Sequence, residues 1–254
     1  MGTPDQIDAG DPWSWCDHTA PFLDTEGDEP ARFRFEQVGD DHFELTDGFI
    51  YQSANTRVEV SEATLVGTDL ASIPFFMAWF VPVNGRHTPA ALVHDQLVQE
   101  SDDDDSPAQA RADADDVFIE AMIYTDVPIL RRNLMFAAVV AATRWDSGWG
   151  TRLAIALWGI LSLLGTVALV AGLVQGGWIW AAAAAVAPLF GAVLWGRRRY
   201  RQGVFAGYAV WFVAVPAAVT IIGYGIYWCA EQVIRIPFSR RRGSDKAPSP
   251  ASYR

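Results

Sequence analysis

Two ionisable residues, His94 and Asp115, lie on faces of predicted helices that are otherwise apolar. His94 shares a helical stripe with Leu97, and Asp115 shares one with Phe118 and Met122, at the spacing of a buried helix face. Both side chains are therefore expected to point inward and to meet. A carboxylate that holds one ring nitrogen of an imidazole leaves the other nitrogen to act as a general base. The pattern predicts a catalytic His94–Asp115 pair that activates water.

Two further carboxylates, Asp95 and Asp69, form a candidate cation site beside this pair. Asp95 directly follows His94 and lies about 100° around the helix from it, near the loop that carries Asp69. Calcium prefers several oxygen ligands, many of them carboxylates. We therefore expect Asp95 and Asp69 to be the metal ligands and calcium to be the candidate cofactor.

Two other sets of metal-ligating residue types are weaker. Cys16 and His18 supply only two ligands, too few for a zinc site. His87 forms only a loosely spaced set of the phosphohydrolase type with His94 and Asp95. We favour neither set.

A purely structural role is the alternative for the same residues. Arg111 precedes Asp115 by four residues, a spacing at which opposite charges pair along a helix. His94 would equally be satisfied by a backbone carbonyl. In this interpretation His94 and Asp115 join Thr68 and Asp69 in a buried network that fixes the helices.

The elements that must position these residues are short strands followed by helices. Apolar and polar residues alternate over 32–35, 43–45 and 57–60, which is the period of strands. Helical patterns follow over 74–81, 89–100, 107–124 and 128–144. Thr88 is expected to cap the second of them. The predicted fold class is α+β, a small antiparallel β-meander followed by three or four helices, then a C-terminal block of three transmembrane helices.

Charge divides the chain into two contrasting parts. Residues 1–150 carry 28 acidic and eight basic residues, whereas residues 151–254 carry two acidic and 11 basic ones. A polyanionic soluble part disfavours nucleic-acid partners. The excess of Asp and the single lysine, Lys246, indicate a halophilic source. Predicted domains are an acidic, disordered segment 1–30, a soluble domain 31–146, a transmembrane block 151–232 and a basic, flexible tail 233–254.

Three uncharged segments define the transmembrane block. They span about 153–174, 178–195 and 204–230, and roughly 20 apolar helical residues cross a bilayer core of about 30 Å. The first two are joined only by Gln-Gly-Gly at 175–177, which predicts a tight helical hairpin. No Asp, Glu, Lys, Arg or His lies inside these spans, so a transporter or channel is disfavoured. The block is expected to anchor the chain in the bilayer, and its Gly and Ala residues favour self-association.

Basic residues predict the orientation of these spans. Arg197, Arg198, Arg199 and Arg201 lie between the second and third segments, and such loops stay in the cytoplasm. The first thirty residues have no secretory signal pattern. We therefore expect a multi-pass protein of the cell membrane with a cytoplasmic soluble domain. Arginines at 240–242 also favour the inside, whereas three crossings place the C-terminus outside; a re-entrant or kinked third segment around Pro216 would reconcile the two.

Three motifs in order resemble a known family. They are Gly-Thr-Asp-Leu-Ala-Ser-Ile-Pro at 67–74, His94-Asp95-x-Leu97, and Arg111-x-x-Ala114-Asp115-x-x-Phe118. Over residues of about 32–145 the chain resembles the domain-of-unknown-function family 1353, which is common in phages and bacteria. The resemblance implies a fold region and no reaction.

The two helical motifs also resemble the viral phospholipase A2-like domains. That resemblance implies that His94 is the base that activates water, that Asp95 ligates calcium and that Asp115 orients His94. Residues 67–69 would stand in place of the calcium loop. The function we expect is a membrane-tethered hydrolase of ester or lipid substrates. The alternative is a non-catalytic interaction or structural module of phage or mobile-element type.

Overall fold

The structure is a computed structural model that describes residues 21–38, 43–61, 65, 68, 77, 80–82, 84–102 and 104–239, with side chains to residue 234. The described residues up to Trp211 form one compact unit, and those from Phe212 onward form a second. The first unit contains the strands, five helices and the beginning of a sixth. All sites described below lie in this first unit.

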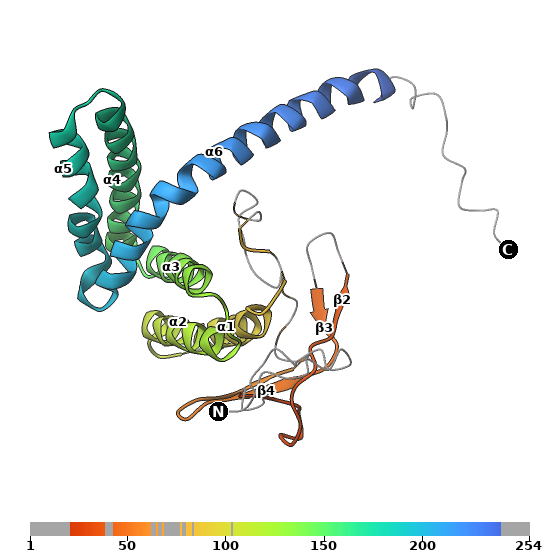
Figure 1. The fold of residues 1–254 in the computed structure, drawn as a ribbon. Helices are drawn as coiled ribbons and strands as arrows, with labels where there is room; N and C mark the ends of the chain where they lie inside the picture. Colours follow the sequence, from red (N-terminus) through yellow and green to blue (C-terminus); the bar gives the residue numbers. More distant parts are fainter. Residues whose placement is uncertain are drawn as a thin grey trace, which may run out of the picture. The chain divides into compact units, whose positions relative to one another are not determined.

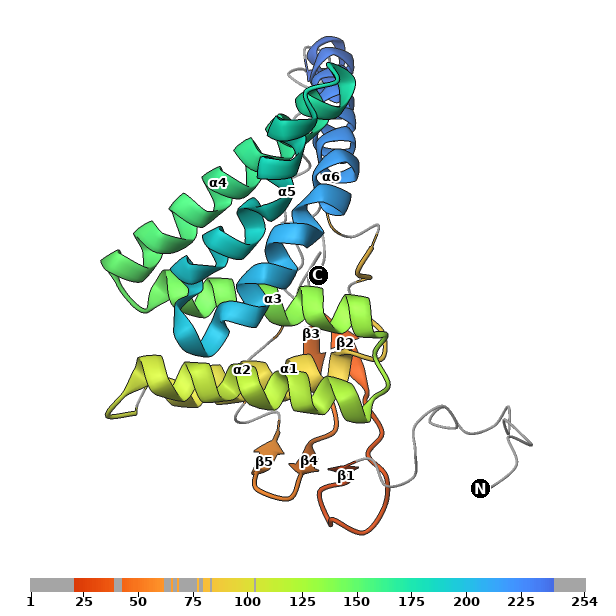
Figure 2. The same ribbon diagram turned by 60° about the vertical axis from the view of Figure 1, so that its left-hand side comes forward.

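Five short strands form two antiparallel sheets. The strands are β1 (Phe22–Leu23), β2 (Phe35–Gln37), β3 (Phe43–Leu45), β4 (Phe49–Gln52) and β5 (Arg57–Val60). One sheet has the order β1-β4-β5 and the other pairs β2 with β3, as Figure 2 shows. The α+β class is confirmed, but the sheet is not a simple meander because the β2–β3 hairpin is inserted between β1 and β4. β1 lies within the predicted acidic segment 1–30, of which residues 1–20 lie outside the described residues, and the disorder of that segment stays a prediction.

Three helices follow the sheets and enclose the core. They are α1 (Thr88–Ser101), α2 (Pro107–Tyr124) and α3 (Ile129–Asp146). The predicted bounds agree with these to within two residues at each end. The cap of α1 differs from the prediction, since His87 is the N-cap residue and the Thr88 hydroxyl accepts the Gly85 N–H.

The core lies between the three-stranded sheet and the helices. Strand alternation turns Val58 and Val60 inward, while Arg57 and Glu59 are exposed, as the two-residue period requires. Further large side chains that are fully buried are Phe49, Tyr51, Leu92, Met122 and Phe136. The core therefore fixes the positions of α1 and α2, the helices that carry His94 and Asp115.

The C-terminal part is helical and apolar. It comprises α4 (Trp149–Val174), α5 (Trp178–Gly191), a 3-10 turn (Ala192–Trp195) and α6 (Gly196–Ser239). Figure 1 labels the three α-helices. Two helical stretches, Trp149–Val174 and Trp178–Ile234, are long and apolar enough to cross a membrane. Within the most apolar part of each stretch, only 17% and 22% of the residues are buried. The prediction of three spanning segments is corrected to two such stretches. α5 has 14 residues, about 21 Å of helix, which is shorter than a bilayer core.

Small residues make the packing of α4 against α5 close. A Cβ added to Gly172 would lie 2.9 Å from the backbone nitrogen of Ala181, so only glycine fits there. Gly176 between these helices adopts a φ of +72°, which glycine tolerates without strain. These features confirm the predicted tight hairpin at 175–177. Later in the chain, α6 continues through Pro216 without a break.

Candidate functional site

α1 and α2 bring His94 and Asp115 together, as their helical periodicity predicts. His94 Nε2 lies 3.0 Å from Asp115 Oδ1, and the two side chains are 14% and 1% exposed. Thr143 on α3 donates its hydroxyl to the same Asp115 oxygen at 3.1 Å. The Phe118 ring packs beside the imidazole, with ring centroids 5.1 Å apart. The carboxylate is thus fixed by two donors and holds one nitrogen of the imidazole.

Asp95 lies on the other side of the imidazole. Its Oδ1 is 3.9 Å from His94 Nδ1, too long for a hydrogen bond but close enough for a strong charge interaction. Its Oδ2 accepts the Thr68 hydroxyl at 2.9 Å. Thr68 is held in turn by paired backbone hydrogen bonds to Phe43 at the start of β3. The sheet therefore positions Asp95, and α2 and α3 position Asp115.

Electrostatics favour the protonated form of His94. Burial alone would lower the pKa of His94, but the hydrogen bond that His94 donates to Asp115 and the negative charges of Asp115 and Asp95 outweigh it. Together they raise the pKa from 6.5 to about 9. At neutral pH the ring is an imidazolium between two carboxylates, and it becomes a base only at higher pH.

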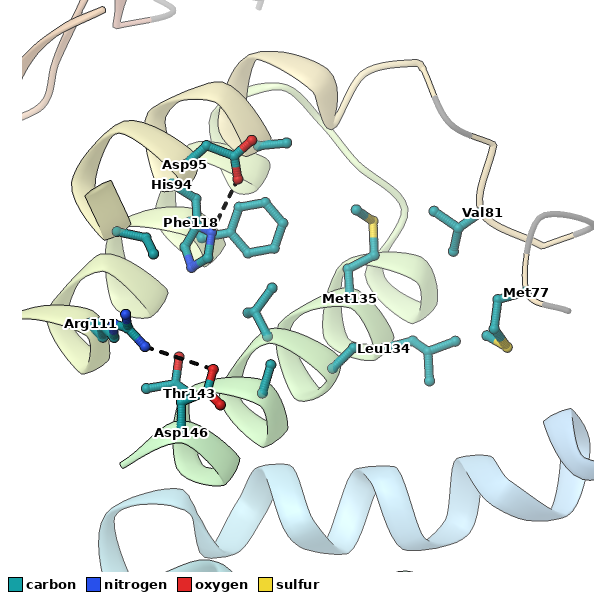
Figure 3. A pocket seen from close by; sticks show the side chains of 15 residues that line it. Met77, Val81, His94, Asp95, Arg111, Phe118, Leu134, Met135, Thr143 and Asp146 are labelled. Carbon is teal, nitrogen blue, oxygen red and sulfur yellow. Dashed lines mark ion pairs between the residues drawn. The ribbon is translucent and has the colours of Figure 1, made fainter. Parts of the chain in front are cut away.

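A cavity of about 320 Å³ opens next to the imidazole, near the lower end of the roughly 300–1,000 Å³ range of ligand sites. His94 and Asp95 line one side of it, whereas Val81, Leu134 and Met135 line another. Figure 3 shows this division between a polar and an apolar side. The cavity suits a molecule with one polar group and an apolar body.

The structure corrects the predicted pairing of Arg111. Its guanidinium contacts Asp102 at 2.6 Å and Asp146 at 3.7 Å, and no ion pair joins it to Asp115 among the described residues. The reason is directional, because Asp115 points to α1 and α3 while Arg111 points to the rim of the cavity. His94 likewise bonds to a carboxylate and not to a backbone carbonyl.

The described residues do not form a complete cation site. No group of three or more His, Cys, Asp or Glu residues that could hold a metal ion occurs among them, whereas calcium takes six to eight oxygen ligands. Asp95 offers one carboxylate, already hydrogen-bonded by Thr68. Asp69, Cys16 and His18 lie outside the described residues. Calcium ligation by Asp95 and Asp69 stays a prediction.

Sequence reasoning missed Thr143 as a partner of the carboxylate. Thr143 stands three residues after Val140 on the buried face of α3, so a hydroxyl at a core position was the available signal. The identity of its acceptor depends on how α3 packs on α2, which a single sequence does not specify.

Comparison with known proteins confirms the family resemblance for the central segment. Residues 43–139 match the model of a family described as "Protein of unknown function (DUF1353)", which includes His94, Asp95, Asp115 and the first part of α3. The match is confined to this segment and leaves the apolar C-terminal helices outside it. No curated protein and no solved structure matches the chain. The similarity to viral phospholipase A2-like domains stays a prediction.

Proposed function

We propose that the protein is a membrane-anchored hydrolase of ester or lipid substrates in which His94 is the general base and Asp115 positions it. The observation that supports this most is the 3.0 Å contact between the two, made by an imidazole that also lines an apolar cavity. Asp115 occupies Nε2, so Nδ1 is the nitrogen available to a water molecule.

The proposed reaction is ester hydrolysis. Neutral His94 takes a proton from water at Nδ1, and the resulting hydroxide attacks the ester carbonyl carbon. The bond between that carbon and the alcohol oxygen then breaks, and the departing oxygen receives the proton from His94. The products are one acid and one alcohol, and His94 returns to its neutral form. Asp115 stabilises the imidazolium formed between these steps.

The apolar side of the cavity supports an acyl chain as the part of the substrate that is bound. The side chains of Leu134, Met135 and Phe118 would cover it, and burial of apolar surface would drive its entry. The two membrane-length helical stretches would keep this cavity near a bilayer. We place the domain on the cytoplasmic side because the arginines at 197–199 favour that side.

Turnover by the full chain in bilayer discs tests this proposal. The substrates are a short-chain nitrophenyl ester and a diacyl phospholipid, assayed between pH 6 and 10. His94→Gln should lower the rate by roughly 100-fold or more, as expected on loss of a general base. The matched control is Arg86→Gln, which removes contacts of an exposed arginine with Asp126; neither residue lines the cavity. Absence of turnover in a folded protein, or equal rates for both variants, would refute the proposal.

One observation favours a second candidate, a non-catalytic module. With a pKa of about 9, His94 is positively charged at neutral pH and links Asp115 on α2 to Asp95 on α1. In that role the ion triad fixes the two helices, and His94→Gln would lower the melting temperature without removing any activity.

A further inference from the structure

A second cavity, of about 350 Å³, lies between α2, α3 and the first turn of α6. We call it the arginine cavity because four arginines line it, namely Arg144, Arg197, Arg198 and Arg199. It is separate from the cavity beside His94, although Thr143 lines both. The proposed hydrolase uses none of these arginines.

Two of the four arginines are neutralised by α2. Arg199, whose side chain is 8% exposed, contacts the Asp116 carboxylate and donates to the Ala112 carbonyl at 2.8 Å. Arg198 contacts Asp116 at 2.7 Å and Asp113 at 3.3 Å. These contacts hold the first turn of α6 against α2.

The other two arginines lack a carboxylate partner among the described residues. Arg144 donates one nitrogen to the Leu194 carbonyl, and Arg197 forms no described ion pair. Asp115 also lines the arginine cavity, but its Oδ1 already accepts His94 and Thr143. The cavity therefore holds more positive than negative charge.

Two buried hydrogen-bond donors of the arginine cavity are suited to an anion. Arg144 Nε is buried and has no hydrogen-bond partner among the residues that the structure describes. The same holds for the indole N–H of Trp195, a residue that is 1% exposed and lines the cavity. Leaving such donors unpaired is costly. Burial and the charge of Arg199 also lower the pKa of Arg144. A bound anion would oppose this effect, because a nearby negative charge stabilises the protonated guanidinium.

We propose that the arginine cavity binds a phosphate group. The planar guanidinium of Arg144 matches two phosphate oxygens at once, and Arg197 supplies a second positive charge at the rim. The cavity lies beside the first residues of α4 and at the junction between the 3-10 turn and α6. If these helices cross a bilayer, this is the level of lipid headgroups, where basic sites between helices bind anionic lipids.

Native mass spectrometry of the full chain in detergent tests this site. The probes are phosphatidylglycerol, phosphatidylcholine and inorganic phosphate, each added in a titration. Arg144→Gln and the exposed-site variant Arg197→Gln should each weaken phosphate-group binding by about tenfold, because each removes a charge-assisted contact. Arg201→Gln is the matched control, since Arg201 belongs to the same helix but does not line the cavity.

The outcomes identify the source of the phosphate. Retention of phosphatidylglycerol over phosphatidylcholine, lost in the two variants and kept in the control, would establish a lipid headgroup. Tight binding of inorganic phosphate with the same dependence on the variants would establish a soluble source. Binding that is absent for every probe, or that falls equally in Arg201→Gln, would overturn the proposal. Should Arg144→Gln fail to fold, Arg197→Gln at the exposed rim still decides between these results.

Discussion

Replacing Asp115 with Asn should change the titration of His94 more than any other substitution at the site. The difference between the ordinary pKa of 6.5 and a pKa of about 9 corresponds to about 3 kcal/mol in favour of the protonated ring. Asp115 contributes most of the raising effect, because it lies 3.0 Å from the ring and is fully buried, whereas Asp95 lies 3.9 Å away and is one-third exposed. Asp115→Asn should lower the pKa of His94 by roughly one to three pH units, and Asp95→Asn by less.

The same shift predicts how stability depends on pH. A histidine whose pKa is raised in the folded state stabilises the fold fully below the unfolded pKa of 6.5. That contribution is lost as the pH rises through about 9. The wild-type chain should therefore lose about 3 kcal/mol of stability across this window, and Asp115→Asn should lose much less. Of the other charged groups that line the cavity, Arg111 and Asp146 contact each other and should leave this trend unchanged.

Carbon-13 NMR of histidine-labelled full chain in detergent measures the pKa directly. The sequence has four histidines, and the signal lost in His94→Gln identifies the resonance. Thermal melting between pH 6 and 9.5 supplies the stability curve. A His94 pKa near 6.5, or one that Asp115→Asn leaves unchanged, would refute this electrostatic account.

Three further substitutions test the supporting structure. Thr143→Val removes a hydrogen-bond donor to the Asp115 carboxylate and should cost about 1 kcal/mol of stability, measured by thermal melting. An unchanged melting temperature would mean that this hydrogen bond is not formed. Asp116→Asn should cost about 1–3 kcal/mol because it leaves buried Arg199 without its carboxylate. Asp113→Asn should cost less than about 0.5 kcal/mol, because the partners of Asp113 are an exposed arginine and Gln109 on the same exposed helix face; equal effects of the two substitutions would contradict the contact between Asp116 and Arg199. Gly172→Ala should destabilise the α4–α5 hairpin by about 1–3 kcal/mol, since the new methyl meets the backbone of α5 at 2.9 Å, and unaltered protease resistance in detergent would show that the helices do not pack this closely.

Periodicity was sufficient to predict the inward residues of the site. The stripe that carries Asp115 is the buried face of α2, whereas Asp113 and Asp116 are exposed at 59% and 41%, as their positions on the helix require. The start of α2 follows from Pro107, which occupies the first helical position. Local pattern and helix geometry thus determined which side chains face the core.

Contacts between elements were not predictable in the same way. The spacing of Arg111 and Asp115 permitted an ion pair, but Asp102 and Asp146 are the partners that the packing of α3 and the α1–α2 loop provides. The pairing of β1 with β4 depends on Phe22 and Tyr51 meeting across a long separation, which alternation alone does not encode. The contact of Arg199 with α2 depends on how the chain turns into α6 at Gly196, where φ is +74°.

The most direct test of the proposed hydrolase is the pH–rate profile of ester hydrolysis by the full chain in bilayer discs. If neutral His94 is the base, kcat/KM should rise with pH, reach half its maximum near the pKa of about 9 and level off above it. Asp95→Asn should move that midpoint to lower pH. A rate that is absent across the range, or a midpoint that does not follow the pKa of His94 measured by NMR, would contradict the assignment of His94 as the base.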